Sequence, residues 1–115
     1  MPDQNERTRR EIEIASTILN QINFGTVSNT AQTISGAHAM LCWGVHRLAA
    51  VASGEGRYGG LGFFVNGARY HGHVQVLYVP GDTYTIILEG QELITDIYFD
   101  QLAEVLDWHI ESGQQ

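Results

Sequence analysis

The sequence predicts an α+β domain with an N-terminal helix, an antiparallel meander of three or more strands, and a C-terminal helix packed on one sheet face. Apolar residues recur at helical spacing near both ends of the chain, whereas they alternate between residues 61 and 88. Turn residues interrupt the alternating stretch at two places, as a chain that reverses direction requires. With 115 residues, the chain is expected to form a single domain, 1–115.

The first helix is expected from Thr8 to Asn23, after a frayed segment at residues 1–6. An opposite-charge pair, Glu6–Arg10, supports its start, and Gly25 suits its end. Its apolar face consists of Ile14, Ala15, Ile18, Leu19 and Ile22.

Residues 26–60 leave two interpretations open. The apolar residues between 37 and 52 fit a helix, but Gly44 interrupts them and residues 46–51 fit a strand equally well. Residues 53–60, SGEGRYGG, carry four glycines and predict a mobile loop.

Two turns define the meander. Asn66-Gly67 suits a two-residue type I′ turn, which would pair Val65 with Ala68 and Phe63 with Tyr70. A three-residue turn at Pro80-Gly81-Asp82 would then keep one face apolar through three strands. The second turn predicts the pairs Tyr78–Tyr84, Val76–Ile86 and Val74–Leu88. The apolar face of the first two strands would contain Leu61, Phe63, Val65, Ala68, Tyr70, Val74, Val76 and Tyr78.

The last helix is expected over residues 97–111. Asp96 suits its N-cap and Gly113 suits its end. Its buried stripe would contain Phe99, Leu102, Leu106 and Ile110.

Composition restricts the setting of the protein. Cys42 is the only cysteine, so an intramolecular disulfide is excluded. Residues 1–6 lack the basic and apolar stretches of a signal peptide, and no apolar run reaches the roughly 18 residues of a membrane span. We therefore expect a soluble cytoplasmic protein.

Charge is distributed unevenly along the chain. The net charge is −7, lysine is absent, and no basic residue follows Arg69. The C-terminal third therefore offers no cationic surface for nucleic-acid phosphates, and we expect no direct nucleic-acid binding there. A basic protein partner fits this surface better.

Four acidic residues of the last helix are spaced four, three and four apart and predict one acidic stripe: Asp100, Glu104, Asp107 and Glu111. We interpret the stripe as a docking surface for a basic protein around the aromatic anchor Trp108. The alternative is a solvated helix face without a partner.

Two other features of the sequence bear on possible chemistry. His71 and His73 share one strand face and are weak metal candidates, but Arg69 on that face disfavours a cation. The alternative is two surface histidines. Cys42 and His46 are too close in sequence for a typical nucleophile–base pair, so neither catalysis nor a cofactor is expected.

An apolar patch is expected on the sheet face opposite the core, made of Phe64, Leu77, Val79 and Ile87. Either residues 37–52 cover this patch or a second copy of the chain does, which would make the protein a self-assembling homo-oligomer.

Five short motifs, spread over most of residues 16–110, resemble small uncharacterised proteins of bacteriophages and mobile elements. The motifs are Thr17-Ile18-Leu19-Asn20-Gln21-Ile22, Trp43-Gly44, Gly60-Leu61-Gly62-Phe63, Asp82-Thr83-Tyr84-Thr85-Ile86 and Ile97-Tyr98-Phe99-Asp100-Gln101-Leu102. The chain departs from that family in its Gly-rich 26–60 region and its lack of lysine. The resemblance implies an accessory protein that acts inside a bacterium, and no site residue follows from it.

Together these observations predict a non-enzymatic accessory protein that binds a host protein stoichiometrically through its acidic surface. The host protein would be a defence or nucleic-acid-handling factor. The rival expectations are a metal- or ligand-binding protein or enzyme that uses His71 and His73, and a self-assembling structural protein.

Overall fold

The structure, a computed structural model, describes residues 4–28, 33–89 and 93–112. Its elements are α1 (Gln4–Asn23), β1 (Thr26–Val27), β2 (Ile34–Ser35), α2 (Gly36–Trp43), β3 (His46–Val51), β4 (Gly59–Asn66), β5 (His71–Val79), β6 (Thr83–Leu88), β7 (Leu93–Ile97), the 3-10 turn η1 (Phe99–Gln101), α3 (Leu102–Asp107) and the π-helical turn η2 (Trp108–Ser112). Strands β3 to β7 form one antiparallel meander in chain order. The predicted α+β class is confirmed.

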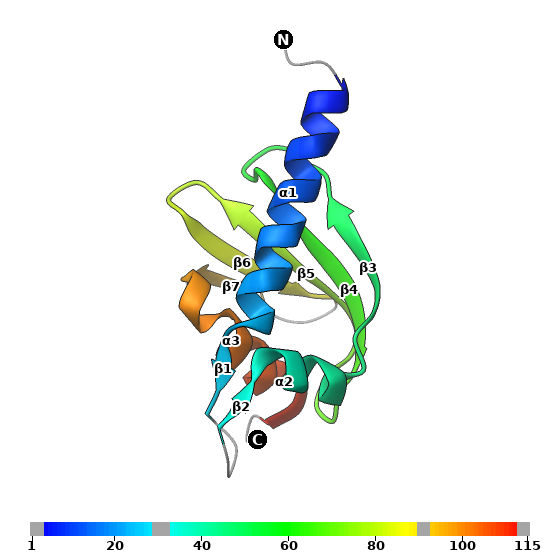
Figure 1. Ribbon diagram of the computed structural model, residues 1–115, viewed down its shortest axis with the longest axis vertical. Helices are drawn as coiled ribbons and strands as arrows, with labels where there is room; N and C mark the ends of the chain where they lie inside the picture. Colours follow the sequence, from blue (N-terminus) through cyan, green and yellow to red (C-terminus); the bar gives the residue numbers. More distant parts are fainter. Residues whose placement is uncertain (1–3, 29–32, 90–92, 113–115) are drawn as a thin grey trace.

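α1 lies across one face of the sheet, and its first turns extend beyond the sheet (Figure 1). It begins at Gln4, earlier than expected, and ends at Asn23 as predicted. Ala15, Ile18 and Ile22 are buried in the core. The other two residues of the predicted face, Ile14 and Leu19, are partly buried against the core. None of the helices in the described ranges combines the length and apolar character of a bilayer span.

The segment between residues 36 and 51 contains both of the alternatives that the sequence left open. Ser35 caps α2, because its hydroxyl accepts a hydrogen bond from the His38 amide at 3.1 Å. Gly44 ends the helix in the left-handed region at φ 66°, where glycine carries no steric penalty. The chain then enters β3, which is an edge strand of the meander.

The β5–β6 register is confirmed, because Tyr78 pairs with Tyr84 and Val76 with Ile86. The predicted two-residue turn between β4 and β5 is wrong: Asn66 pairs with His71. The four residues between them dock on the C-terminal helix, where the Ile110 carbonyl accepts hydrogen bonds from the amides of Arg69 and Tyr70 at 2.9 and 3.2 Å.

The slip in register preserves the core face. The real pairing joins Phe63 to Val74 where the prediction joined it to Tyr70, which is a shift by an even number of residues. Ala68 is the exception, because it lies exposed in the loop. The glycine-rich loop is also shorter than expected: Gly60 belongs to β4, and a Cβ there would lie 2.4 Å from the Val76 carbonyl oxygen.

The C-terminal helix begins later than predicted. Asp96 belongs to β7, so it is not the N-cap; Tyr98 occupies that position. Leu102, Leu106 and Ile110 are buried as predicted. Phe99 is 60% exposed, because it sits in a 3-10 turn whose tighter winding rotates it off the helical stripe. Gly113 lies outside the described residues.

Candidate functional site

Three neighbouring cavities follow one flank of α1 and share lining residues, and we call them together the α1 groove. The first, of about 590 Å³, is the arginine end, where Arg7, Arg10 and Arg57 meet. The second, of about 500 Å³, shares Arg10, Ile14, Tyr78 and Asp82 with the first. The third, of about 510 Å³, is the phenylalanine end and shares Thr17, Gln21 and Phe99 with the second.

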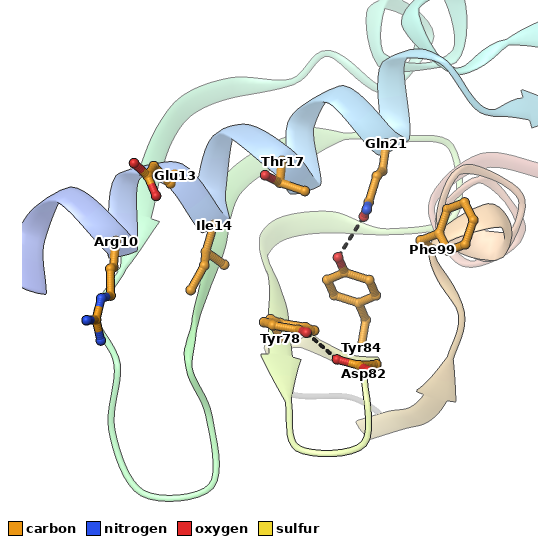
Figure 2. Close-up of a pocket in the computed structure, with 9 residues that line it drawn as sticks. All are labelled: Arg10, Glu13, Ile14, Thr17, Gln21, Tyr78, Asp82, Tyr84 and Phe99. Atoms are coloured by element: carbon orange, nitrogen blue, oxygen red, sulfur yellow. Dashed lines mark hydrogen bonds between the residues drawn. The ribbon is translucent and has the colours of Figure 1, made fainter.

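The helical wall of the groove consists of residues spaced three or four apart: Arg10, Ile14, Thr17, Gln21 and Phe24. This spacing places them on one stripe of α1, beside the stripe that packs into the core. In the middle of the groove, Ile14 and Gln21 extend from α1 toward the β5–β6 hairpin, whereas Arg10 extends toward the loop after β3 (Figure 2). Of the residues in this stripe, Ile14 is also partly buried against the core.

The floor of the groove is a chain of three tyrosine rings. The ring centroids of Tyr58 and Tyr78 are 5.2 Å apart, and those of Tyr78 and Tyr84 are 5.4 Å apart. The Tyr84 hydroxyl donates a hydrogen bond to Gln21 Oε1 at 2.7 Å, and the Tyr78 hydroxyl donates one to Asp82 (Figure 2). The pairing of β5 with β6 thus holds the rings of Tyr78 and Tyr84 side by side. The hydrogen bond to Gln21 connects Tyr84 to α1.

Both hydroxyls at the floor are held in their neutral form. The hydrogen bond to Asp82 raises the pKa of Tyr78 to about 12, and burial raises the pKa of Tyr84. A phenol that ionises only in alkali offers a ring face and a hydroxyl near neutral pH, but no base.

The arginine end is fastened to the loop after β3. Glu11 Oε2 accepts hydrogen bonds from the amide and hydroxyl of Ser53 at 2.5 and 2.9 Å. Arg7 donates to the Ser53 hydroxyl and carbonyl at 3.0 and 3.1 Å. The Ser53 hydrogen bonds lower the pKa of Glu11. We call this contact the Ser53 clip.

Arg57 and Arg10 complete the arginine end. Arg57 Nε donates to the Ala52 carbonyl at 3.0 Å, which holds the guanidinium on its own loop. Within the described ranges, no hydrogen bond or ion pair engages the Arg10 side chain, which lines both the arginine end and the middle of the groove.

At the phenylalanine end, two large apolar side chains are open to solvent. Phe24, just beyond α1, is 85% exposed, and Phe99 is 60% exposed. Both line the same cavity, together with Asp100. Phe24, Tyr58, Tyr78, Tyr84 and the arginines were not expected as site residues from the sequence.

The predicted acidic stripe is not a continuous exposed surface. Asp107 is 2% exposed and accepts a hydrogen bond from Trp43 Nε1 at 2.8 Å. Glu104 accepts two hydrogen bonds from Ser28, both at 2.7 Å. Glu111 accepts one from the Ala68 amide at 2.8 Å. Three of the four acids therefore bind the chain itself.

The remaining two residues of the expected docking surface are exposed. Asp100 lies at the phenylalanine end, and Trp108 is 43% exposed beside a cavity of about 320 Å³ that also contacts Glu104. The acidic set is thus divided between internal anchors and one residue of the groove.

His71 and His73 lie on one strand, as predicted. His73 packs its ring against Phe64, with centroids 4.8 Å apart. Three or more potential metal ligands do not come together anywhere in the described parts of the chain. Cys42 is an exposed free thiol, and His46 Nδ1 lies 2.8 Å from the Gly44 carbonyl oxygen.

The expectation that residues 37–52 cover the outer sheet face is wrong for most of the segment. α2 packs against the helices, and β3 extends the sheet edge. Only the start of β3 reaches the expected patch, where His46 stacks on Phe64 with centroids 5.8 Å apart and Arg47 lies 5.8 Å from that ring. Leu77 is nevertheless nearly buried, whereas Val79 and Ile87 are half-buried.

Comparison of the chain with models of protein families, with curated protein sequences and with solved structures gives no significant match. The geometry itself describes a groove with an aromatic floor, cationic groups at one end and exposed apolar rings at the other.

Proposed function

We propose that the protein acts by stoichiometric binding to a partner protein at the phenylalanine end of the α1 groove. Phe24 and Phe99 carry this proposal: both are more than half exposed, and both line one cavity of about 510 Å³. Large apolar side chains exposed around a hollow are typical of interaction sites, and aromatic residues provide much of the binding energy at such sites.

The partner is expected to present an apolar side chain flanked by basic residues. Asp100 lies beside Phe99 in the same cavity. No basic residue follows Arg69, so the C-terminal part of the chain carries an excess of negative charge. Complementary charge speeds association and excludes acidic partners. The acidic character expected from the sequence would thus contribute to partner binding through Asp100 and through the negative charge of the C-terminal part of the chain.

The resemblance to phage and mobile-element proteins supports a bacterial setting for this interaction. We propose an accessory protein of a mobile element whose partner is a host protein, such as a defence or nucleic-acid-handling factor. Binding alone would suffice for such a role.

Paired serine substitutions test the proposal. The tagged Phe24→Ser/Phe99→Ser protein is compared with the wild type in quantitative affinity capture from a bacterial host. Leu41→Ser is the matched control, because Leu41 is 80% exposed on α2 and lines none of the three cavities of the groove. We expect a stoichiometric partner whose affinity falls by about tenfold or more in the double variant only, since one interface anchor contributes about 2 kcal/mol.

The same partners captured equally by all three proteins would contradict the proposal. Urea unfolding of each variant checks that the loss of capture does not come from loss of fold. Removing an exposed apolar side chain should change stability by no more than about 0.5 kcal/mol.

A further inference from the structure

We propose that the arginine end of the α1 groove binds a mononucleotide, whose base stacks on the tyrosine floor and whose phosphate meets the arginines. This ligand is independent of the protein partner proposed above, because the two sites occupy opposite ends of the groove. The proposal rests on three properties of the cavity: an open aromatic surface, a surplus of cationic groups and a suitable volume.

The aromatic surface is provided by Tyr58 and Tyr78. Tyr58 is 49% exposed, although its ring packs against that of Tyr78 with the ring centroids 5.2 Å apart. Because the two rings are inclined by 47°, the half-exposed ring of Tyr58 offers the stacking face for a planar ligand, and Tyr78 holds that ring in place. Stacking of a nucleobase on an aromatic side chain contributes about 1–3 kcal/mol and tolerates different bases.

The cavity has more cationic than anionic side chains, and its carboxylates are already engaged within the protein. Three guanidinium groups line it, against the carboxylates of Glu11 and Asp82. Glu11 is engaged by Ser53 and by Arg7, and Asp82 accepts a hydrogen bond from the Tyr78 hydroxyl. The Arg10 guanidinium has no such bond to a described residue. Arginine presents paired donors that match phosphate oxygens.

The size and the position of the cavity favour one nucleotide over a nucleic-acid strand. A volume of about 590 Å³ falls within the range of roughly 300–1,000 Å³ for small-molecule sites. Beyond Tyr78 the groove continues past Glu13 to Asp100. The phosphates of a longer strand laid along the groove would meet these carboxylates, whereas a single phosphate at the arginine end would not.

Isothermal titration calorimetry of the intact protein tests this site. The probes are the four ribonucleoside monophosphates, adenosine, inorganic phosphate and a ten-residue oligothymidylate. We expect at least one monophosphate to bind about tenfold more tightly than adenosine or phosphate alone, since each half of the ligand contributes one stacking or charge-assisted contact. The oligonucleotide should bind no more tightly than the best monophosphate.

Two matched pairs of variants locate the ligand. Arg10→Gln should weaken binding about tenfold, whereas Arg9→Gln, on the same helix turn but outside the cavity, should change it less than about twofold. Tyr58→Leu should weaken binding by a similar factor, and Tyr58→Phe should retain it because the ring remains.

Four results would overturn the proposal: no binding of any monophosphate at millimolar concentration, equal binding of phosphate alone, tighter binding of the oligonucleotide, or equal losses in Arg9→Gln and Arg10→Gln. None of these variants alters Phe24 or Phe99, so failure of the nucleotide site leaves the test of the protein partner unaffected.

Discussion

Asp107 belongs by its spacing to an acidic stripe, yet it lies in the core with only 2% of its surface exposed. Its Oδ1 accepts the hydrogen bond of Trp43 Nε1 at 2.8 Å, across 64 positions of sequence. The spacing of acids on a helix shows which residues share a face, but it does not show which long-range donor that face meets. Glu104 and Glu111 illustrate the same limit, because their donors, Ser28 and Ala68, are also distant in sequence.

Replacing Asp107 should therefore destabilise the protein. In Asp107→Ala the buried indole N–H of Trp43 loses its acceptor, and an unsatisfied buried donor costs about 1–3 kcal/mol of unfolding free energy. Urea unfolding followed by fluorescence measures this change. Asp100→Ala, an exposed acid of the same set, should shift the unfolding free energy by no more than about 0.5 kcal/mol. Equal effects of the two substitutions would show that the hydrogen bond does not stabilise the core.

Phe99 shows how a small local difference creates a site. Helical spacing assigns it to the buried stripe with Leu102, but it precedes α3 in a 3-10 turn and faces solvent. Sequence periodicity cannot separate these cases within one turn, because 3-10 and α winding differ by less than one residue. The exposure of Phe99 was therefore not predictable, although its position beside the last helix was.

At the scale of elements, turns were predictable where they are local. Pro80-Gly81-Asp82 closes the β5–β6 hairpin from its own residues, and its register matched the prediction. The Asn66-Gly67 turn did not match, because Ile110 and Glu111 accept hydrogen bonds from the following loop. A contact with a distant helix outweighed a local preference.

The Ser53 clip joins two elements and should respond to pH. Hydrogen bonds from Ser53 lower the pKa of Glu11 below its ordinary 4.5. The charged form is thus favoured in the folded state, so the clip contributes stability above pH 4.5 and loses it as pH falls through the lowered pKa. The difference in unfolding free energy between wild type and Glu11→Gln should be largest near neutral pH and shrink in acid.

Denaturant unfolding at several pH values from about 3 to 7 measures this difference. The protection factor of the Ser53 amide, which donates to Glu11, should decrease over the same acidic range in hydrogen exchange measurements corrected for the intrinsic pH dependence of the rate. A stability difference that is constant with pH would mean that the Glu11 charge does not hold the loop.

Both edges of the sheet carry an irregularity with a charged residue in the left-handed region. Arg47 in β3 has φ 55° and Asp96 in β7 has φ 60°, each where the pairing register shifts. Bulges at sheet edges interrupt the row of free backbone groups and disfavour pairing with another chain. If the protein self-associates, the outer sheet face suits this better than the edges.

At the scale of the whole molecule, the basic residues gather near the start of α1. Four of the six arginines, namely Arg7, Arg9, Arg10 and Arg57, belong to the first turns of α1 or to the loop after β3, whereas no basic residue follows Arg69. The molecule is elongated, with extents of 50, 28 and 27 Å. The α1 groove follows this helix from the arginines to Phe24.

The groove itself was beyond prediction from the sequence. Its residues come from α1, the loop after β3, the β5–β6 hairpin and η1, and only the fold brings them together. The fold class, the two main helices and most core residues followed from periodicity, because burial imposes a pattern on each element. A cavity at the surface imposes no periodic pattern on the sequence, so the residues that line it cannot be distinguished there from other polar and aromatic residues.

Site-specific photo-crosslinking in bacterial cells tests the central claim most directly. A photoreactive phenylalanine analogue replaces Phe99, which is 60% exposed, in one protein and Leu41, which is 80% exposed, in another. We predict that the Phe99 position gives a discrete crosslink to one partner protein, and that an excess of unlabelled wild-type chain competes it away while the Leu41 position gives none. Crosslinks of equal yield and identity from both positions, or none from Phe99, would contradict a partner site at the phenylalanine end of the groove.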